Sequence, residues 1–545
     1  MSAHPQAQSG EAQAIADIAA SRSSKAAKVL LCGGFLLLIA AVALSNLRPL
    51  RQSWQHLATA LIHGQGRTEG SPWQRLLQHN EAVLDALRAV DKAYDDQSPF
   101  CVALQPQVQA ALCAIGEGGD EVLMGRAGWL FHRSALRALT RDAGAAQGPQ
   151  ASASIRAIAE LADFLKKRGI ALVLLPMPPK LAVHPEALGR DLPAQVLEPA
   201  WWSAWKAQAQ RAGAEVFDPL PLLRQWRKEQ REALYLRTDT HWTAATMQRC
   251  AEALATHLQT HHGLVAKPDA AARTLAQKQT AHGDLQRMLR LPAGSTQFLP
   301  QEIPIAQVRN AEGLPWPMSN RGSLLLLGDS FCNIYSQASL GWGSGAGFAE
   351  HLGRALGQPI NAMLRNGDGA FATRAMLSRA LQTGDDRLEG CSVLVWEFDA
   401  TQILEGQWKS LRYELGKAPP SSFLELAPKS RQRLIGSVVS LSPTPLPGSV
   451  AYRDFVGTLH LRGLRTAEGG ALSATEVLAY GLAMQDNRLT ALAQLRPGDE
   501  VEVELRPWSE KETEMGPLNR GEPQGDLFLQ PIHWLDSLRP LPSEP

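Results

Sequence analysis

The stretch that decides the fold is Ser323-Leu324-Leu325-Leu326-Leu327-Gly328-Asp329-Ser330-Phe331. Four consecutive leucines are typical of a strand buried on both faces, and the glycine and small polar residues that follow end a strand and begin a helix. We therefore predict Ser330 at a strand-to-helix turn. Such turns lie at the carboxyl edge of a parallel sheet, where ligands bind in α/β folds.

Other apolar runs extend this pattern along the chain. The predicted strands besides 323–327 are 170–175, 360–364 and 392–398, and the predicted helices are 152–167, 243–259, 348–356 and 374–381. Short apolar strands that alternate with helices indicate an α/β fold, in which a parallel sheet is flanked by helices. We assign this domain to residues 120–417.

The pattern of apolar and polar residues changes after about residue 417. A proline-rich connector (441–448) leads to segments in which apolar and polar residues alternate, as at 455–462 and 500–505. Alternation with a period of two is typical of half-buried strands. We predict a small C-terminal β-rich domain over 418–545, either a sandwich or a small barrel.

One long segment near the N-terminus carries no charge. Between Lys28 and Arg48 the sequence is almost wholly apolar, and about 20 such residues in a helix cross a bilayer. A cleaved signal peptide is the alternative, because Ala41-Val42-Ala43 resembles a small-residue cleavage site. The predicted order is a disordered cytoplasmic tail (1–27), a transmembrane anchor (28–48) and a helical linker (49–119).

Composition narrows the class of protein. Among 545 residues, 54 Lys and Arg balance 53 Asp and Glu, which gives a net charge of +1. A protein with so little net positive charge shows no general attraction to nucleic acid. Six cysteines in this length cannot form a disulfide scaffold, and none is spaced as a CxxC pair. Cys101 and Cys113 fit either a disulfide or two buried thiols.

A serine hydroxyl needs a base before it can act as a nucleophile. The candidate base lies in Thr238-Asp239-Thr240-His241-Trp242-Thr243, just before a predicted helix. In a non-helical Asp-x-His segment alternate side chains share a face, so Asp239 can orient His241. Ser330, His241 and Asp239 together would support acyl transfer, with backbone amides at the helix start holding the oxyanion.

Simpler interpretations of both motifs stay open. Gly-Asp-Ser can be a helix N-cap, and the Asp-Thr-His segment can be an N-cap beside a packed His-Trp pair. Cys332 is either a rival nucleophile or a packing residue on the first helical turn. No cofactor and no metal site are predicted, because no His-Glu-x-x-His motif or cysteine cluster accompanies Asp239 and His241.

The two motifs in this order, TDTHWT (238–243) and GDSF (328–331), resemble the alginate O-acetyltransferase family of the AlgX/AlgJ type. Three further stretches are similar to motifs of that family: GRAGWLF (125–131), PPKLAVHPE (178–186) and VLVWEF (393–398). The resemblance covers about residues 120–415. It implies an SGNH-hydrolase-like catalytic domain, although ordinary SGNH hydrolases place the serine motif before the histidine motif.

The resemblance also implies a function. Ser330 would be the acyl-accepting nucleophile, His241 the general base and acid, and Asp239 the orienting carboxylate of a periplasmic O-acetyltransferase that acts on an exopolysaccharide. A membrane-bound O-acyltransferase partner at the inner membrane would supply acetyl groups. The alternatives are an acetyl esterase with the same triad and a non-catalytic polysaccharide-binding or secretion scaffold.

Three more residues are candidates for oxyanion or substrate binding. Asn366 follows a predicted strand, and the alternative is that it only tolerates positive φ in the glycine-rich turn 365–369. Tyr335 can reach the pocket or cover the sheet. Gly328 precedes the serine turn directly.

Overall fold

We describe a computed structural model of the chain, which covers residues 25–45 and 99–541 with short gaps. The gaps are at 190, 193, 230–231, 266–271, 368, 417–421, 446, 449, 451, 467–469, 471, 524–526 and 529. Residues up to 108 form one compact unit and residues 109–545 form another. Most of the predicted tail (1–27) and of the predicted linker (49–119) lies outside the described residues.

Helix α2 (Lys25–Ser45) covers most of the predicted anchor. Apolar side chains along it, among them Val29, Leu30 and Phe35, are exposed. Among the helices of the described residues, none is both long enough and apolar enough to cross a bilayer. The anchor over 28–48 therefore stays a prediction.

Helix α5 (Pro99–Ala114) carries both cysteines for which a disulfide was one alternative. Cys113 is buried and has a free thiol, which accepts a hydrogen bond from Gln109 Nε2 at 3.6 Å. The side chain of Cys101 lies outside the described residues. For Cys113 the structure therefore agrees with the buried-thiol alternative.

The second unit contains a six-stranded sheet in the order β4-β3-β10-β8-β9-β7, with every pairing parallel. The strands are β3 (Ala171–Met177), β4 (Glu215–Val216), β7 (Met318–Ser319), β8 (Leu324–Gly328), β9 (Ile360–Leu364) and β10 (Val393–Asp399). All five residues of β8 are buried. Successive side chains of a strand point to opposite faces, so both faces of the sheet are covered there. The predicted α/β fold is confirmed.

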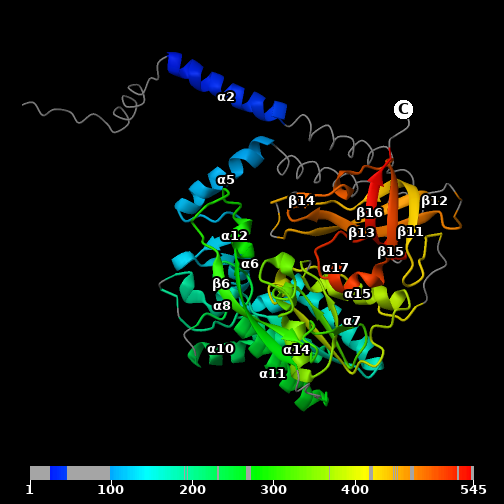
Figure 1. Cartoon of the computed structure of the whole chain (residues 1–545). Coiled ribbons are helices and arrows are strands. Elements are labelled where there is room, and N and C mark those ends of the chain that lie inside the picture. The colour runs from blue at the N-terminus through cyan, green and yellow to red at the C-terminus, as the bar shows by residue number, and fades with distance from the viewer. Residues whose placement is uncertain are drawn as a thin grey trace, which may run out of the picture. The chain divides into compact units, whose positions relative to one another are not determined.

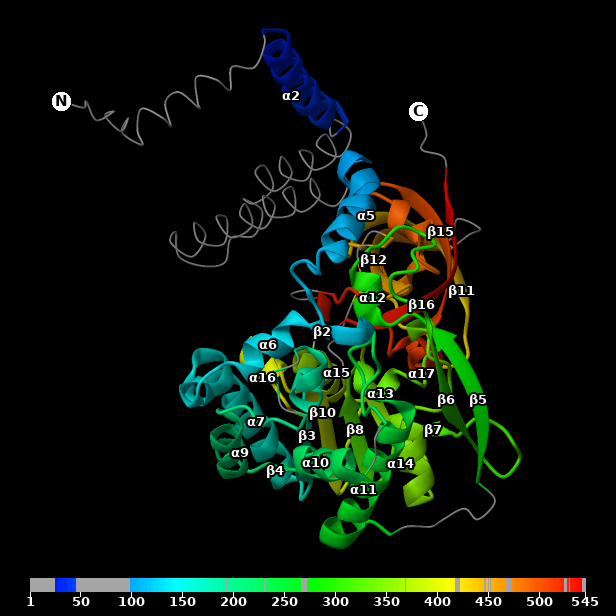
Figure 2. The same cartoon turned by 90° about the vertical axis from the view of Figure 1, so that its left-hand side faces the viewer.

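The second unit also contains helices, among which α7, α11, α14 and α15 correspond to the four predicted ones. The helices are α6 (Arg133–Leu139), α7 (Pro149–Lys167), α8 (Lys180–Val183), α9 (Trp202–Arg211), α10 (Leu220–Glu229), α11 (Ala244–His262), α12 (Asp284–Met288), α13 (Ser330–Asn333), α14 (Phe348–Leu356), α15 (Gly369–Gln382), α16 (Gln402–Glu405) and α17 (Glu512–Met515). Figure 2 shows β3, β10 and β8 side by side within this helical shell.

Two antiparallel strand pairs accompany the sheet and were not predicted. The short one joins β1 (Val122–Met124) to β2 (Leu130–His132), and the long one joins β5 (Arg273–Ala281) to β6 (Gln301–Arg309). Strand β5 is mostly exposed and rich in polar residues. It lacks the alternating pattern of a half-buried strand, so its hydrophobicity gave no signal.

The C-terminal β-rich domain is a small barrel, the second of the two predicted alternatives. Strands pair in the order β12-β11-β15-β16-β13, and an additional β12–β13 pairing closes the ring. The strands are β11 (Gln432–Leu441), β12 (Phe455–Thr466), β13 (Glu476–Gln485), β14 (Arg488–Leu489), β15 (Glu500–Pro507) and β16 (Ile532–Pro540). Val501, Val503 and Leu505 point into its core, as their alternation predicts. Figure 1 labels β11, β12, β13, β15 and β16 side by side in yellow to red.

Candidate active site

Three side chains from two distant parts of the chain meet at the carboxyl edge of the sheet. His241 Nε2 lies 2.8 Å from Ser330 Oγ, and His241 Nδ1 lies 2.6 Å from Asp239 Oδ1. Asp239 is fully buried and His241 is 5% exposed. A hydroxyl, an imidazole and a carboxylate in this order can activate a serine for acyl transfer.

Local secondary structure positions Ser330. Strand β8 ends at Gly328, and α13 begins directly after the N-cap residue Asp329. Asp329 Oδ1 accepts from the Phe331 amide at 2.8 Å, and Oδ2 accepts from the Asp399 amide at 3.0 Å. The N-cap interpretation of Gly-Asp-Ser is confirmed, since Asp329 caps the helix, and Ser330 lies within hydrogen-bond distance of His241.

Gly328 is needed for close packing of the same turn. A Cβ atom at this position would lie 2.5 Å from Cys332 Sγ and 3.0 Å from Leu364 Cδ2. No side chain fits that space without displacing its neighbours. The Gly328 carbonyl accepts from the Arg365 amide at 2.9 Å, so the described contacts give Gly328 a role in shaping the turn.

The loop that carries Asp239 and His241 is irregular, and the side chain of Lys180, on helix α8, binds its carbonyl oxygens. Lys180 Nζ donates to the carbonyl oxygens of Leu236 at 2.8 Å, Arg237 at 3.0 Å and Asp239 at 2.7 Å. The Lys180 side chain is buried. Burial lowers its pKa to about 7, although nearby carboxylates oppose this shift. One ammonium group thus adds to the few backbone hydrogen bonds of this segment, such as that from the Leu236 amide to the His241 carbonyl.

Tyr335 braces the residue next to His241. It is fully buried, and its hydroxyl donates to the Trp242 carbonyl at 2.6 Å. Because a phenol has one hydrogen to donate, this contact uses the donor that a substrate or oxyanion would need. The structure therefore does not support the predicted role of Tyr335 in oxyanion or substrate binding. It supports the alternative, a packing role. Trp242 Nε1 in turn donates to the Phe331 carbonyl at 3.1 Å and links the two halves of the site.

Two carboxylates set the charge around His241. Asp239 Oδ2 accepts from Trp342 Nε1 at 2.8 Å and from the Asp284 amide at 2.9 Å. Asp284 Oδ2 lies 3.8 Å from His241 Nδ1. Burial alone would lower the pKa of His241, but the Asp239 and Asp284 carboxylates raise it above its ordinary value. Burial likewise opposes ionisation of Asp239, and contact with His241 lowers its pKa nonetheless.

Asp239, His241 and Asp284 are also close enough to surround a metal ion. However, the oxygens of Asp239 are directed at N–H groups. Oδ1 accepts from the amide and Nδ1 of His241, and Oδ2 accepts from Trp342 and the Asp284 amide. Since four donors already occupy this carboxylate, the arrangement fits a catalytic triad better than a metal centre.

Asn366 lies beside α13. Its Oδ1 accepts from Asn333 Nδ2 at 2.9 Å, and its Nδ2 donates to Gln337 Oε1 at 2.8 Å. A primary amide has two N–H groups, so one donor remains for an oxyanion, and this role stays a prediction. The positive φ of the glycine-rich turn falls on Gly367 (74°), not on Asn366.

Cys332 packs on the first helical turn. Its thiol is buried and donates to Glu397 Oε2 at 3.2 Å. Burial and the neighbouring Glu397 raise the pKa of this thiol well above its ordinary value. Because the thiolate is the reactive form, these surroundings disfavour Cys332 as a rival nucleophile. Glu397 Oε2 also accepts from the Asp329 amide at 2.9 Å and so supports the serine turn.

Sequence reasoning missed four supporting residues. Lys180 and Glu397 lie in stretches that carried the family resemblance, so a signal existed, although their contacts could not be read from it. Asp284 and Trp342 had no comparable signal. The structure explains the glycine just before Asp284: a Cβ atom at Gly283 would lie 2.1 Å from the Thr238 carbonyl oxygen, so only glycine lets this segment approach the histidine loop.

Comparisons with known proteins identify the family of this chain. Residues 122–400, more than half of the 545, match the family model described as SGNH hydrolase-like domain, acetyltransferase AlgX. The probable alginate O-acetylase AlgJ of Pseudomonas aeruginosa is 29% identical over 316 residues, which are 57% of this chain and 78% of that protein. The AlgJ of Pseudomonas putida is 31% identical over 258 residues, or 46% and 65%.

Among solved structures, the O-acetyltransferase domain of Pseudomonas putida AlgJ is similar. It is 26% identical, the match covers 52% of this chain and 92% of that chain, and the TM-score is 0.41. For AlgX of Pseudomonas aeruginosa the identity is 16%, the coverages are 70% and 90%, and the TM-score is 0.39.

Proposed function

Because the chain belongs to the family of the SGNH hydrolase-like acetyltransferase AlgX, we propose that it acetylates an exopolysaccharide through an acetyl-serine intermediate. The observation that carries this proposal is the hydrogen-bonded series Ser330–His241–Asp239 at the sheet edge. The names of the relatives, probable alginate O-acetylases, support a polysaccharide as acceptor.

In the first step, Ser330 Oγ attacks the carbonyl carbon of an acetyl donor while its proton passes to His241 Nε2. Asp239 stabilises the imidazolium that forms. The tetrahedral intermediate then breaks the bond to the donor, the leaving group takes the proton from Nε2, and Ser330 carries the acetyl group.

In the second step, a sugar hydroxyl gives its proton to Nε2 and its oxygen attacks the acetyl-serine. Collapse of the intermediate returns the proton to Ser330 Oγ and leaves the acetylated sugar. The amides of Phe331 and Cys332 donate to Asp329. We therefore assign the oxyanion to the Ser330 amide and to the remaining N–H of Asn366.

We further propose that the body of the protein works in the periplasm, anchored in the inner membrane by residues 28–48. The support is the uncharged sequence of that segment. A membrane-bound O-acyltransferase would supply the acetyl groups, because acetyl donors must reach a site on the other side of the membrane from the cytoplasm.

The test is acetyl transfer by the full chain from p-nitrophenyl acetate to alginate oligosaccharides, with the mass of the sugar and the release of acetate both followed. The expected result is a mass gain on the sugar that is lost in Ser330→Ala and in His241→Ala. Cys332→Ala is the matched control, two residues from the nucleophile, and should keep the transfer.

Without acceptor, an acetyl adduct on Ser330 should accumulate in the intact-protein mass spectrum. Acetate release without mass gain on any sugar would identify an esterase and contradict the transferase. Neither acetate nor adduct would contradict a catalytic serine altogether and favour the scaffold.

A further inference from the structure

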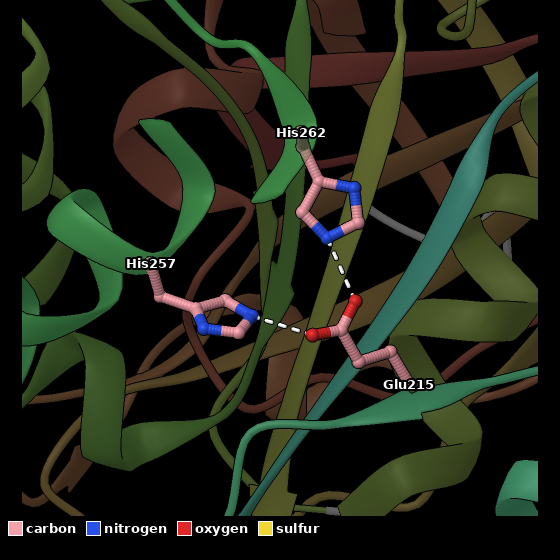
Figure 3. Close-up of side chains that lie close together, drawn as sticks. All are labelled: Glu215, His257 and His262. Carbon is pink, nitrogen blue, oxygen red and sulfur yellow. Dashed lines mark hydrogen bonds and ion pairs between the residues drawn. The ribbon is translucent and has the colours of Figure 1, made fainter. Parts of the chain in front are cut away.

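A second group of ionisable side chains lies away from the serine. Glu215 is the first residue of the edge strand β4, and His257 and His262 belong to the last six residues of α11. His257 Nε2 lies 2.6 Å from Glu215 Oε1, and His262 Nε2 lies 2.8 Å from Oε2. Figure 3 shows both imidazoles directed at the one carboxylate.

We propose that Glu215, His257 and His262 bind a transition-metal ion of the zinc class. One ligand atom from each residue lies within 4.8 Å of the others. A tetrahedral zinc with bonds of about 2.0–2.2 Å places its ligand atoms about 3.3 Å apart. Small side-chain rotations therefore convert the group into a three-ligand site.

Solvent can complete the coordination. The side chains of Glu215, His257 and His262 are 37%, 20% and 13% exposed. An ion can enter from that side, and water can take the fourth position.

The donor set selects the class of ion. Two imidazoles and one carboxylate suit zinc, copper or nickel, whereas magnesium and calcium prefer oxygen ligands alone. Among the described residues, Glu215 has no ion pair with Lys or Arg that would already neutralise it. On binding, each Nε2 presents its lone pair to the ion. A neutral ring then carries its proton on Nδ1, and a protonated ring releases one proton to solvent.

Two rings pack against His257, and one of them, His261, provides a control. Phe217 contacts its edge at a centroid distance of 5.1 Å, and His261 stacks on it at 4.3 Å. His261 Nδ1 lies 3.1 Å from the His257 carbonyl oxygen, so this nitrogen is directed at the backbone. His261 therefore has the same chemistry, on the same turn, without a place in the site.

The position of the site indicates a structural role. Glu215 pairs with Val173, four residues before β3 ends at Met177. Helix α11 begins three residues after His241 and extends to His262, a length of about 28 Å at 1.5 Å per residue. A bound ion would tie the far end of this helix to the edge strand of the sheet.

The test is zinc binding by the full chain after removal of metals with a chelator, measured by competition with a chromophoric indicator. We expect one equivalent of zinc and no competition from magnesium. His257→Ala and His262→Ala should each lower the affinity at least about tenfold, and His261→Ala should not change it. Glu215→Gln should also weaken binding, although its amide can still accept from one imidazole and donate to the other.

Thermal melting gives a second measure. Saturating zinc should raise the Tm of the unaltered chain by about 2 °C or more and leave the Tm of His257→Ala unchanged. A folded chain that binds no zinc, or equal zinc affinities in His257→Ala and His261→Ala, would overturn the proposal. Labelling of Ser330 by a sulfonyl fluoride tests the acetyltransferase proposal separately, because it does not depend on the metal.

Discussion

The serine turn (328–333) and the histidine loop (236–243) meet at one edge of the sheet, yet different forces hold them. The serine turn is the junction of β8 and α13, placed by strand pairing and by its own N-cap. The histidine loop consists of bends, and Lys180 holds its carbonyl oxygens. The serine is thus placed at the junction of two regular elements, whereas the position of the histidine depends on side-chain contacts to an irregular loop.

The largest expected effect comes from the carboxylate of the histidine loop. Asp239→Asn should lower the kcat/KM of acetyl transfer by about 10³–10⁴-fold, because the amide neither fixes the His241 tautomer nor stabilises the imidazolium. The measurement is steady-state transfer at neutral pH, with circular dichroism to confirm folding. A folded variant with nearly full activity would show that the His241–Asp239 contact is not catalytic.

Lys180→Met should affect both activity and stability. It removes the Nζ donor from the buried carbonyl oxygens of Leu236 and Asp239, whereas the Arg237 carbonyl keeps the Leu130 amide as a donor. We expect a cost of about 2–4 kcal/mol of unfolding free energy. Displacement of the loop by about 1 Å should lower kcat/KM roughly 10²-fold. The measurements are urea unfolding and acetyl transfer.

The matched control is Lys278→Met, because the Lys278 side chain is 75% exposed and its ion pair with Glu302 contributes little. If Lys180→Met and Lys278→Met unfold at the same urea concentration, the contacts of Lys180 do not stabilise the histidine loop. The proposed difference between the histidine loop and the serine turn would then be wrong.

Gly328→Ala tests the serine turn. Its Cβ would clash with Cys332 Sγ, so we expect a loss of about 1–3 kcal/mol in unfolding free energy and a smaller loss of activity than in Lys180→Met. The double variant Gly328→Ala/Cys332→Ala removes the clashing sulfur and should recover part of the stability. Thermal unfolding of the three variants measures this, and full additivity would exclude the clash.

The smallest effect is a shift in pH dependence. In the proposed mechanism the base form of His241 is active, so we expect the rate to fall as pH drops through its raised pKa. Asp284→Asn removes one nearby carboxylate and keeps an oxygen for the Thr240 amide. The midpoint of the kcat/KM profile should therefore move to lower pH by about one unit. An unchanged midpoint would mean that Asp284 carries no charge beside His241.

Prediction from sequence succeeded where the physical cause is local. Leu324–Leu327 determine a buried strand by their apolar run, and the small polar residues after them place Ser330 at a turn. The predicted meeting of Ser330, His241 and Asp239 is present. The role of Tyr335 was open because its partner, the Trp242 carbonyl, is distant in the sequence.

The sequence by itself determined the α/β class, the alternating strands of the C-terminal domain and the residue types of the triad. These follow from hydrophobic periodicity and from the chemistry of single side chains, which a linear chain already displays. Only the tertiary structure decided that the β-rich domain closes into a barrel, that Lys180 holds the histidine loop, and that Glu215 faces His257 and His262. Each of these depends on groups that become neighbours only when the chain folds, because burial and hydrogen bonding act through space and not along the sequence.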